Sequence, residues 1–422
     1  MRILSLFATL CFGMVTQGAE SLRAGAAKID ITPPIGYPMW GYAARHDAPS
    51  VGVLEPLFAR ALVIAVGDQR IALVGLDLGR APTRDSTEVI RKKVREGGIT
   101  EIFLVGSHTH HGPVIELDQW PDAKTSYVRA LESKLAQVII DAAKQLQPAR
   151  IGIARKACVF NRNRHSKRDD RPIDNELLVL RVETTDGKLI AHAVNFAAHP
   201  TMIETKIHRF SPDYVGHLCG TVEKETGVPC VFLQGAAGDM SPNSTPERKT
   251  YDLFGQAIGE EVLQISKTIR CEVPKTPALI SHHETLRFKA RIDVANPIIK
   301  RAISEAFFPD LVAFYEREYR EGVRPELTLA LLNEKIGIVG VSGEVFCAHS
   351  LSLKRRARLE HVLFLGYCND YQQYFPTIEA CAEGGYGTVP PVGLAEVGAG
   401  EKIIDRALLK LYQMRELIDP EN

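Results

Sequence analysis

The chain has no excess of either charge, because 51 lysines and arginines balance 51 aspartates and glutamates over 422 residues. This balance excludes the basic footprint that nucleic-acid or anionic-membrane binding requires, so we expect no nucleic-acid partner. The sequence also lacks internal repeats, low-complexity tracts and serine- or proline-rich linkers, which predicts one domain after the N-terminal segment. No CxxC pair is present, and this absence argues against a zinc site built from thiolates.

Long hydrophobic runs are scarce, and the one at the N-terminus predicts a secretory signal. Arg2 precedes the apolar segment Ile3–Val15, and small residues favour cleavage after Ala19. The segment is too short to remain as a membrane span. We therefore expect residues 1–19 to be removed, no transmembrane segment afterwards, and a secreted or periplasmic protein. Removal of Cys11 leaves seven of the 8 cysteines, so at least one stays free or pairs between chains.

Strand-like and helix-like runs alternate along the rest of the chain, which predicts an α/β fold with a mixed β-sheet core flanked by helices. Short apolar runs predict strands at 71–78, 102–105, 177–182, 189–196, 229–234, 335–341 and 361–367. Apolar residues at helical spacing predict helices at 126–146, 213–225, 250–269, 297–320 and 401–417.

A histidine cluster directly follows the predicted strand 102–105. His108, His110 and His111 stand within one short polar segment. In an extended chain successive side chains alternate, so His108 and His110 are expected on one side and His111 on the other. Two imidazoles on one side make half of a zinc site, or one ligand plus one proton donor. The alternative is a polar turn with incidental histidines.

Polar loops also follow four other predicted strands, and the ends of strands are where α/β proteins assemble their sites. The five polar segments are Ser107–His110, Ala197–Thr201, Gly235–Asn243, Ser342–Glu344 and Asn369–Tyr374. They offer His108 or His110, His199 and Glu344 as ligands. Together they predict one metal centre at the C-terminal ends of the strands.

Known hydrolase signatures are missing around these residues. The pattern H-x-H-x-D-H fails because Gly112 and Pro113 stand where aspartate and histidine are required, and H-E-x-x-H is absent. Ser241 lies in Gly-Asp-Met-Ser-Pro, which is not the G-x-S-x-G of a nucleophile elbow. Pro242 removes the N–H that would follow a nucleophile in an oxyanion hole. Alone, Ser241 is equally typical of a turn or a helix cap.

An ordered set of motifs nevertheless resembles the catalytic domain of the neutral/alkaline ceramidase family. The motifs run in the family's order from about residue 23 to the end of the chain. They are Lys28–Pro34 with Gly41–Ala43, Ser107–Pro113, Asn161–Arg162, Asn195–Thr201, Gly238–Asn243, Gly343–Glu344, Tyr371–Thr377 and Gly384–Tyr386. Each motif is short, but the ordered set is specific.

The resemblance implies one Zn²⁺ per chain and a role for each matching residue. The implied ligands are His108, His199, Glu344 and Tyr374. The implied catalytic residues are His110 as donor to the developing oxyanion, Arg162 and Tyr386 at the amide oxygen or leaving group, and Ser241 at the family's serine position. Attack by Ser241 and attack by zinc-activated water both remain open, with Pro242 and the metal favouring water.

Simpler structural roles compete with several of these assignments. Tyr374 and Tyr386 can be core or surface aromatics, and Glu344 can be a carboxylate at a helix N-terminus. Arg162 can serve an ion pair, and Arg164 is a rival two positions on.

The resemblance implies an exported zinc-dependent amidohydrolase that cleaves the N-acyl amide of ceramide or a related N-acyl lipid. Alternatives are a zinc hydrolase for a different amide or ester, such as an N-acyl sugar or peptide, and a non-catalytic exported binding protein. Two departures from the family stand out. His111 occupies a position where the family commonly has serine. Larger members continue into an immunoglobulin-like domain, whereas residues 20–422 are expected to form the catalytic domain alone.

Overall fold

The computed structural model describes residues 21–306 and 309–419, so the expected signal peptide at residues 1–19 lies outside the described residues. A mixed eight-stranded sheet has the order β11-β9-β8-β6-β1-β3-β4-β5. Its strands are β1 Leu22–Asp30, β3 Phe58–Val66, β4 Gln69–Leu76, β5 Glu101–Gly106, β6 Gln147–Ala157, β8 Glu176–Thr184, β9 Leu189–Phe196 and β11 Cys230–Gln234. The two outermost pairs, β11 with β9 and β4 with β5, are parallel, and the other neighbours are antiparallel.

A second sheet of four strands packs against one face of the first. Its order is β13-β14-β15-β17, with bounds Leu279–Thr285, Glu326–Leu332, Ile336–Val341 and His361–Leu365. Side chains alternate between faces along each strand. In β5, Phe103 and Val105 therefore join the core between the sheets, whereas Ile102 and Leu104 face helices on the other side.

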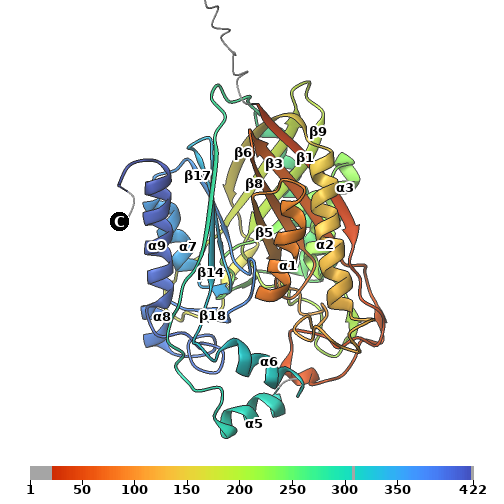
Figure 1. Cartoon of the computed structure of the whole chain (residues 1–422), viewed down its shortest axis with the longest axis vertical. Coiled ribbons are helices and arrows are strands. Elements are labelled where there is room, and N and C mark those ends of the chain that lie inside the picture. The colour runs from red at the N-terminus through yellow and green to blue at the C-terminus, as the bar shows by residue number, and fades with distance from the viewer. Residues whose placement is uncertain (1–20, 307–308, 420–422) are drawn as a thin grey trace, which may run out of the picture.

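Helices cover both outer faces, so the molecule has four layers: helix, sheet, sheet and helix (Figure 1). The helices α1 Arg84–Arg95 and α2 Tyr127–Lys144 cover the β1–β5 half of the large sheet. The other half is covered by α3 Tyr214–Thr226 and α4 Tyr251–Thr268. The outer face of the small sheet packs against α7 Cys347–Arg356 and α9 Ala399–Met414.

Shorter elements complete the chain. They are β2 Gly52–Val53, β7 Asn161–Asn163, β10 Arg209–Phe210, β12 Met240–Pro242, β16 Glu344–Val345, β18 Tyr374–Phe375, α5 Pro297–Ala306, α6 Leu311–Glu318, α8 Ile378–Glu383 and the 3-10 turns Ala43–Arg45 and Pro246–Arg248. None of the helices in the described part of the chain is long and apolar enough to cross a membrane.

The predicted α/β class and mixed sheet flanked by helices are confirmed, with two differences in detail. The predicted strands 335–341 and 361–367 form β15 and β17 of a separate sheet. The prediction of one helix over 297–320 is wrong, because α5 and α6 are distinct and Pro309 lies between them. A proline ring clashes with the preceding turn and removes a backbone donor inside a helix.

Backbone hydrogen bonds hold the ends of the predicted site-bearing strands together. Gly106 at the end of β5 donates to the Tyr367 carbonyl at 3.1 Å, and Gly366 donates to Gln234 at the end of β11 at 3.0 Å. Gly235 donates to Phe196 at the end of β9 at 2.8 Å. The polar loops that follow these strands therefore start from one place in the fold.

Close backbone packing inside the large sheet depends on Gly75 of β4. A Cβ atom there would lie 2.4 Å from the carbonyl oxygen of Phe232 in β11. We predict that Gly75→Ala lowers the free energy of unfolding by about 1–3 kcal/mol, because the two backbones must separate. The control is Gly220→Ala on the exposed side of α3, where a Cβ meets nothing within 4 Å.

Gly220→Ala should stabilise the protein by about 0.5–1 kcal/mol through helix propensity. Denaturant unfolding monitored by circular dichroism measures both variants. Equal stability of Gly75→Ala and the wild type would contradict the close approach of β4 and β11.

Candidate metal centre

His108 is held by the loop that follows β4. Its backbone N–H donates to Leu78 at 2.9 Å, and its ring Nδ1 lies 2.8 Å from the Gly79 carbonyl oxygen. A carbonyl can only accept, so Nδ1 carries the proton and Nε2 presents a lone pair, as in histidines that bind metals. The segment is not extended, since His108 has a positive φ of 71°.

His199 is fixed in the same protonation state by one carbonyl group. Its backbone N–H and its ring Nδ1 approach the Met240 oxygen at 3.1 and 3.2 Å. Burial, and then the neighbouring charge of Arg164, lower the pKa of His199 to about 3. The ring is therefore neutral at physiological pH, which is the form that binds zinc.

Glu344 and Tyr374 are direct partners in the parallel pairing of β16 with β18, so their side chains share one face. Glu344 Oε2 lies 3.4 Å from His108 Nε2 and 3.1 Å from His199 Nε2. The three groups form a buried centre of two imidazoles and one carboxylate.

The spacing of these atoms fits one metal ion. Zinc bonds of about 2.0–2.1 Å in a tetrahedral site place neighbouring ligand atoms about 3.3 Å apart. The separations of 3.4 and 3.1 Å from Glu344 Oε2 to the two Nε2 atoms match that value. Imidazole lone pairs directed at a carboxylate repel it, and a cation between them would stabilise the arrangement. A ligand set of imidazole nitrogens and a carboxylate oxygen is one that zinc prefers.

His110 lies at the same centre. Its Nε2 is 3.2 Å from His108 Nε2, and the described residues include a group of His108, His110 and His199 able to hold an ion. Its Nδ1 is buried without a hydrogen-bond partner among those residues. Gly41, with a φ of 111°, makes room for it, since a Cβ there would lie 2.7 Å from the ring. Geometry alone permits His110 as a ligand or as a donor beside the ion.

His111 points away from the centre and contacts Arg45, which gives this departure from the family pattern a structural role. Arg45 approaches His111 Nε2 at 2.6 Å and also donates to the carbonyls of His110, Trp40 and Thr205. Burial, and then Arg45, lower the pKa of His111 to about 3, so it accepts as a neutral ring. The pair fixes the backbone around His110.

Arg164, rather than Arg162, reaches the histidines. Its guanidinium lies 2.8 Å from His199 Nε2, 3.2 Å from the Tyr374 hydroxyl and 2.9 Å from the Gly238 carbonyl oxygen. Arg162 is exposed, and its side chain makes none of the hydrogen bonds or ion pairs found among the described residues, although its backbone pairs with Ser241 in β12. β7 ends at Asn163, and the chain turns Arg164 toward His199 after it, while the expected role of Arg162 at the amide oxygen or leaving group stays a prediction.

Ser241 and Tyr386 lie at the margin of the centre. Ser241 is half-buried in β12 and stands opposite Arg162 of β7 in the antiparallel pair. Tyr386 is 69% exposed, and its ring packs edge-on against Tyr374 with centroids 5.6 Å apart. Tyr386 therefore borders the entrance to the centre.

Two further tyrosines hold Glu344 and were not expected from the sequence. Tyr371 donates to Glu344 Oε1, and Tyr367 donates to Oε2 at 3.3 Å. Both hydroxyls are buried. Tyr371 lies within the motif Tyr371–Thr377 of the family resemblance. That motif is the signal in the sequence that could have indicated Tyr371, because its spacing from the other site residues indicates nothing.

Comparison with known proteins places this chain in a family. A profile of the family described as neutral/alkaline non-lysosomal ceramidase, N-terminal, matches residues 22–252. The chain belongs to this family. It is 30% identical over 255 residues to neutral ceramidase of Pseudomonas aeruginosa, covering 52% of this chain and 37% of that protein. It is 27% identical over 170 residues to neutral ceramidase B of Dictyostelium discoideum, covering 34% of this chain and 24% of that protein.

This ceramidase-family chain thus spans well under half the length of these curated relatives. Its fold matches the crystal structure of neutral ceramidase from Pseudomonas aeruginosa with a TM-score of 0.78 and 19% identity, over 96% of this chain and 76% of that one. A structure titled ceramidase complexed with C2 matches with a TM-score of 0.76 and 18% identity, over the same shares. These likenesses establish the fold.

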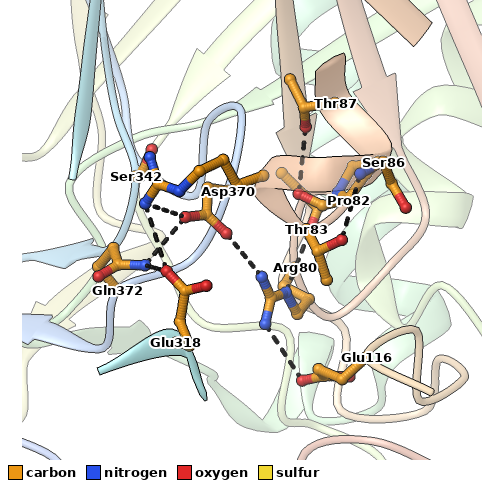
Figure 2. Close-up of polar contacts among 12 residues, drawn as sticks. Arg80, Pro82, Thr83, Ser86, Thr87, Glu116, Glu318, Ser342, Asp370 and Gln372 are labelled. Carbon is orange, nitrogen blue, oxygen red and sulfur yellow. Dashed lines mark hydrogen bonds and ion pairs between the residues drawn. The ribbon is translucent and has the colours of Figure 1, made fainter. Parts of the chain in front are cut away.

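A buried ionic network centred on Arg80 is linked to the centre through Trp40 and Tyr371, and Figure 2 shows Arg80 between Glu116 and Asp370. Arg80 lies between Glu116 and Asp370, at 3.3 and 2.9 Å, and all three are at most 3% exposed. Glu116 also accepts from the Trp40 indole at 3.1 Å, and Trp40 packs on His108 with ring centroids 5.1 Å apart. Asp370 precedes Tyr371, so Arg80 links the two sides of the centre.

Replacing Arg80 should expose how much this network contributes. We predict that Arg80→Met lowers the free energy of unfolding by about 3–5 kcal/mol, because Glu116 and Asp370 lose a buried countercharge. Arg95→Met, on the exposed side of α1, is the matched control and should change it by less than about 0.5 kcal/mol. Similar denaturation midpoints for the two variants would show that the network does not stabilise the fold.

Proposed function

We propose that this chain is an exported, zinc-dependent amidohydrolase that cleaves linear N-acyl amides. The observation that carries the proposal is the convergence of the His108 and His199 Nε2 atoms on the buried carboxylate of Glu344. Family membership supports the reaction class, since the named relatives are neutral ceramidases.

In this proposal His108, His199, Glu344 and Tyr374 hold the zinc ion. When bound, zinc polarises the substrate carbonyl and lowers the pKa of the attacking water. Tyr371 and Tyr367 donate to Glu344 and keep its carboxylate oriented toward the histidines. A carboxylate fixed in this way needs little rearrangement when the ion binds.

Three side chains are proposed to act on the substrate. His110 presents a buried Nδ1 without a protein partner, and its ring lies beside His108, where charge on the amide oxygen would develop. Tyr386 borders the same space. Arg162 was expected to share this work, and the position of Arg164 beside His199 and Tyr374 supports Arg164 in its place.

Water, rather than Ser241, is proposed as the nucleophile. A serine nucleophile needs a base within about 2.6–3.2 Å of its hydroxyl. The Ser241 hydroxyl has no hydrogen-bond partner among the described residues, and the nearby His199 directs its Nδ1 to the Met240 carbonyl. We assign Ser241 to binding the substrate at the rim.

Two substrate classes follow from this proposal. The amide of ceramide, or of a related N-acyl lipid, is the first to test because of the relatives' names. A smaller, polar amide is the second, favoured by a cavity of only about 80 Å³ beside the histidines.

Export is proposed from the N-terminal sequence. The protein recovered outside the cytoplasm should begin at residue 20, which N-terminal sequencing measures.

Loss of a proposed ligand should abolish metal binding. We predict one zinc ion per wild-type chain and more than about a 100-fold loss of zinc affinity in His199→Ala, since even the outer partners of ligands contribute 10- to 100-fold. His217→Ala is the control, because His217 pairs with Glu55 outside the centre. Elemental analysis and titration against a competing chelator measure both. Full zinc occupancy of His199→Ala would rule out His199 as a ligand.

Substitution of Ser241 should separate the two candidate nucleophiles. If water attacks, Ser241→Ala keeps kcat within about tenfold of wild type, because only a substrate contact is lost. A serine nucleophile would instead cost a factor of about 10⁴ or more, as in enzymes that form acyl intermediates. Steady-state kinetics on any amide that the wild type cleaves gives the answer, and a burst of acyl-enzyme would contradict attack by water.

A further inference from the structure

Two hollows of different character meet at the proposed metal centre. The first, the inner cavity, has a volume of about 80 Å³ and is lined by His108, His110, Glu344 and Tyr374 at one end. The second, the outer groove, has a volume of about 690 Å³ and is lined by Arg164, Lys167 and Arg168. Tyr386 lines both, and Arg164 touches Tyr374.

The inner cavity is small, and its lining away from the metal end includes the polar side chains of His46 and Gln373. Its other walls are mostly aromatic and aliphatic: Met39, Trp40, Tyr42, Val114, Leu311, Tyr315, Tyr371 and Val392. A volume of 80 Å³ is well below the about 300–1,000 Å³ of pockets for drug-sized ligands. An acyl group of two to four carbons fits this cavity, and a long acyl chain does not.

The outer groove carries an excess of positive charge. Arg168 pairs with Asp170 at 3.0 Å, and Glu383 accepts hydrogen bonds from Ser166. Arg164 and Lys167 have no acidic partner among the ion pairs of the described residues, and Lys167 is exposed. The groove is therefore cationic, although the chain as a whole is neutral.

We infer that the substrate is a short-chain N-acyl amide whose amine portion carries an anionic group such as a carboxylate. This inference rests on the proposed amide hydrolysis at the same centre. The acyl group occupies the inner cavity, the scissile carbonyl lies at the histidines, and the anion lies in the groove beside Arg164 and Lys167. Hydrolysis transfers the acyl group to water and releases a short carboxylic acid and an anionic amine.

The opposite orientation is disfavoured by desolvation. A charged group in the inner cavity would lose its water among aromatic side chains, and burial of an unpaired charge is costly. In the groove the same group keeps contact with solvent and lies beside the cations Arg164 and Lys167. Arg164 and Lys167 therefore decide which half of the substrate faces outward.

Matched substrates test the inference with the zinc-loaded wild-type protein. The anionic set is N-acetylglycine, N-acetyl-β-alanine and N-acetyl-γ-aminobutyrate, and the neutral set is the corresponding carboxamides. We expect at least one acid to exceed its carboxamide by about tenfold in kcat/KM, with the advantage falling as salt rises. Within the preferred pair, acetyl and butyryl groups should exceed an octanoyl group by about tenfold or more.

A charge reversal in the groove locates the effect. Lys167→Glu should lower kcat/KM for the preferred acid by about five- to tenfold more than kcat/KM for the matching carboxamide, because the charge reversal acts on the anion. Lys267→Glu is the control, since Lys267 is an exposed lysine of α4 that lines neither hollow. Equal losses on acid and carboxamide would overturn the assignment of the groove.

The outcomes separate this inference from the proposed function. Faster hydrolysis of ceramide or of octanoyl amides than of the short acids would overturn the inference and leave amide hydrolysis intact. Zinc bound at the histidines without hydrolysis of any amide, ceramide included, would overturn both. Preference for short acyl groups without preference for the acid would overturn the anionic part of the substrate alone.

Discussion

The arrangement around Glu344 depends on one electrostatic constraint: a buried carboxylate must be compensated. The Oε2 atom of Glu344 faces two imidazole nitrogens at 3.4 and 3.1 Å and accepts a hydrogen bond from Tyr367, and its Oε1 atom accepts one from Tyr371. Each histidine is in turn fixed by a backbone carbonyl, which directs its lone pair inward. A buried centre of this kind persists only when every partner is held, because an unpaired charge in the interior is costly.

The backbone accepts local strain to meet that constraint. Positive φ values occur at His108, Tyr367, Asn369 and Gln373, all non-glycine residues in loops around the centre. Such conformations cost about 1–3 kcal/mol each and survive where the surroundings determine them. Asn369 shows how: its side chain donates to Ile102 at 2.7 Å and accepts from Leu104 at 2.8 Å, which ties the loop to β5.

The sequence could predict which strands end near the site but not how the loops then turn. Apolar runs precede His108, His199 and Glu344, so the sequence could predict that these residues lie at the ends of strands. Tyr374 followed only from the family resemblance. Arg162 and Arg164 differ by two positions, and only the end of β7 at Asn163 decides which reaches inward. His111 could not be explained locally, because its partner Arg45 lies 66 residues earlier. Apolar runs also do not reveal which sheet a strand joins, so the second sheet was not predicted.

The charge of Arg164 acts on both the outer groove and the centre, because this residue contacts both. Its guanidinium contacts His199 and Tyr374 on one side and lines the groove on the other. An anion in the groove would interact with Arg164, the same cation that hydrogen-bonds two proposed ligands. The Coulomb energy between two charges a few ångströms apart exceeds thermal energy when solvent is partly excluded. The groove charge and the geometry of the ligands are therefore coupled. A cation at this position borders the groove while it hydrogen-bonds two of the proposed ligands, so one side chain serves both parts of the proposed site.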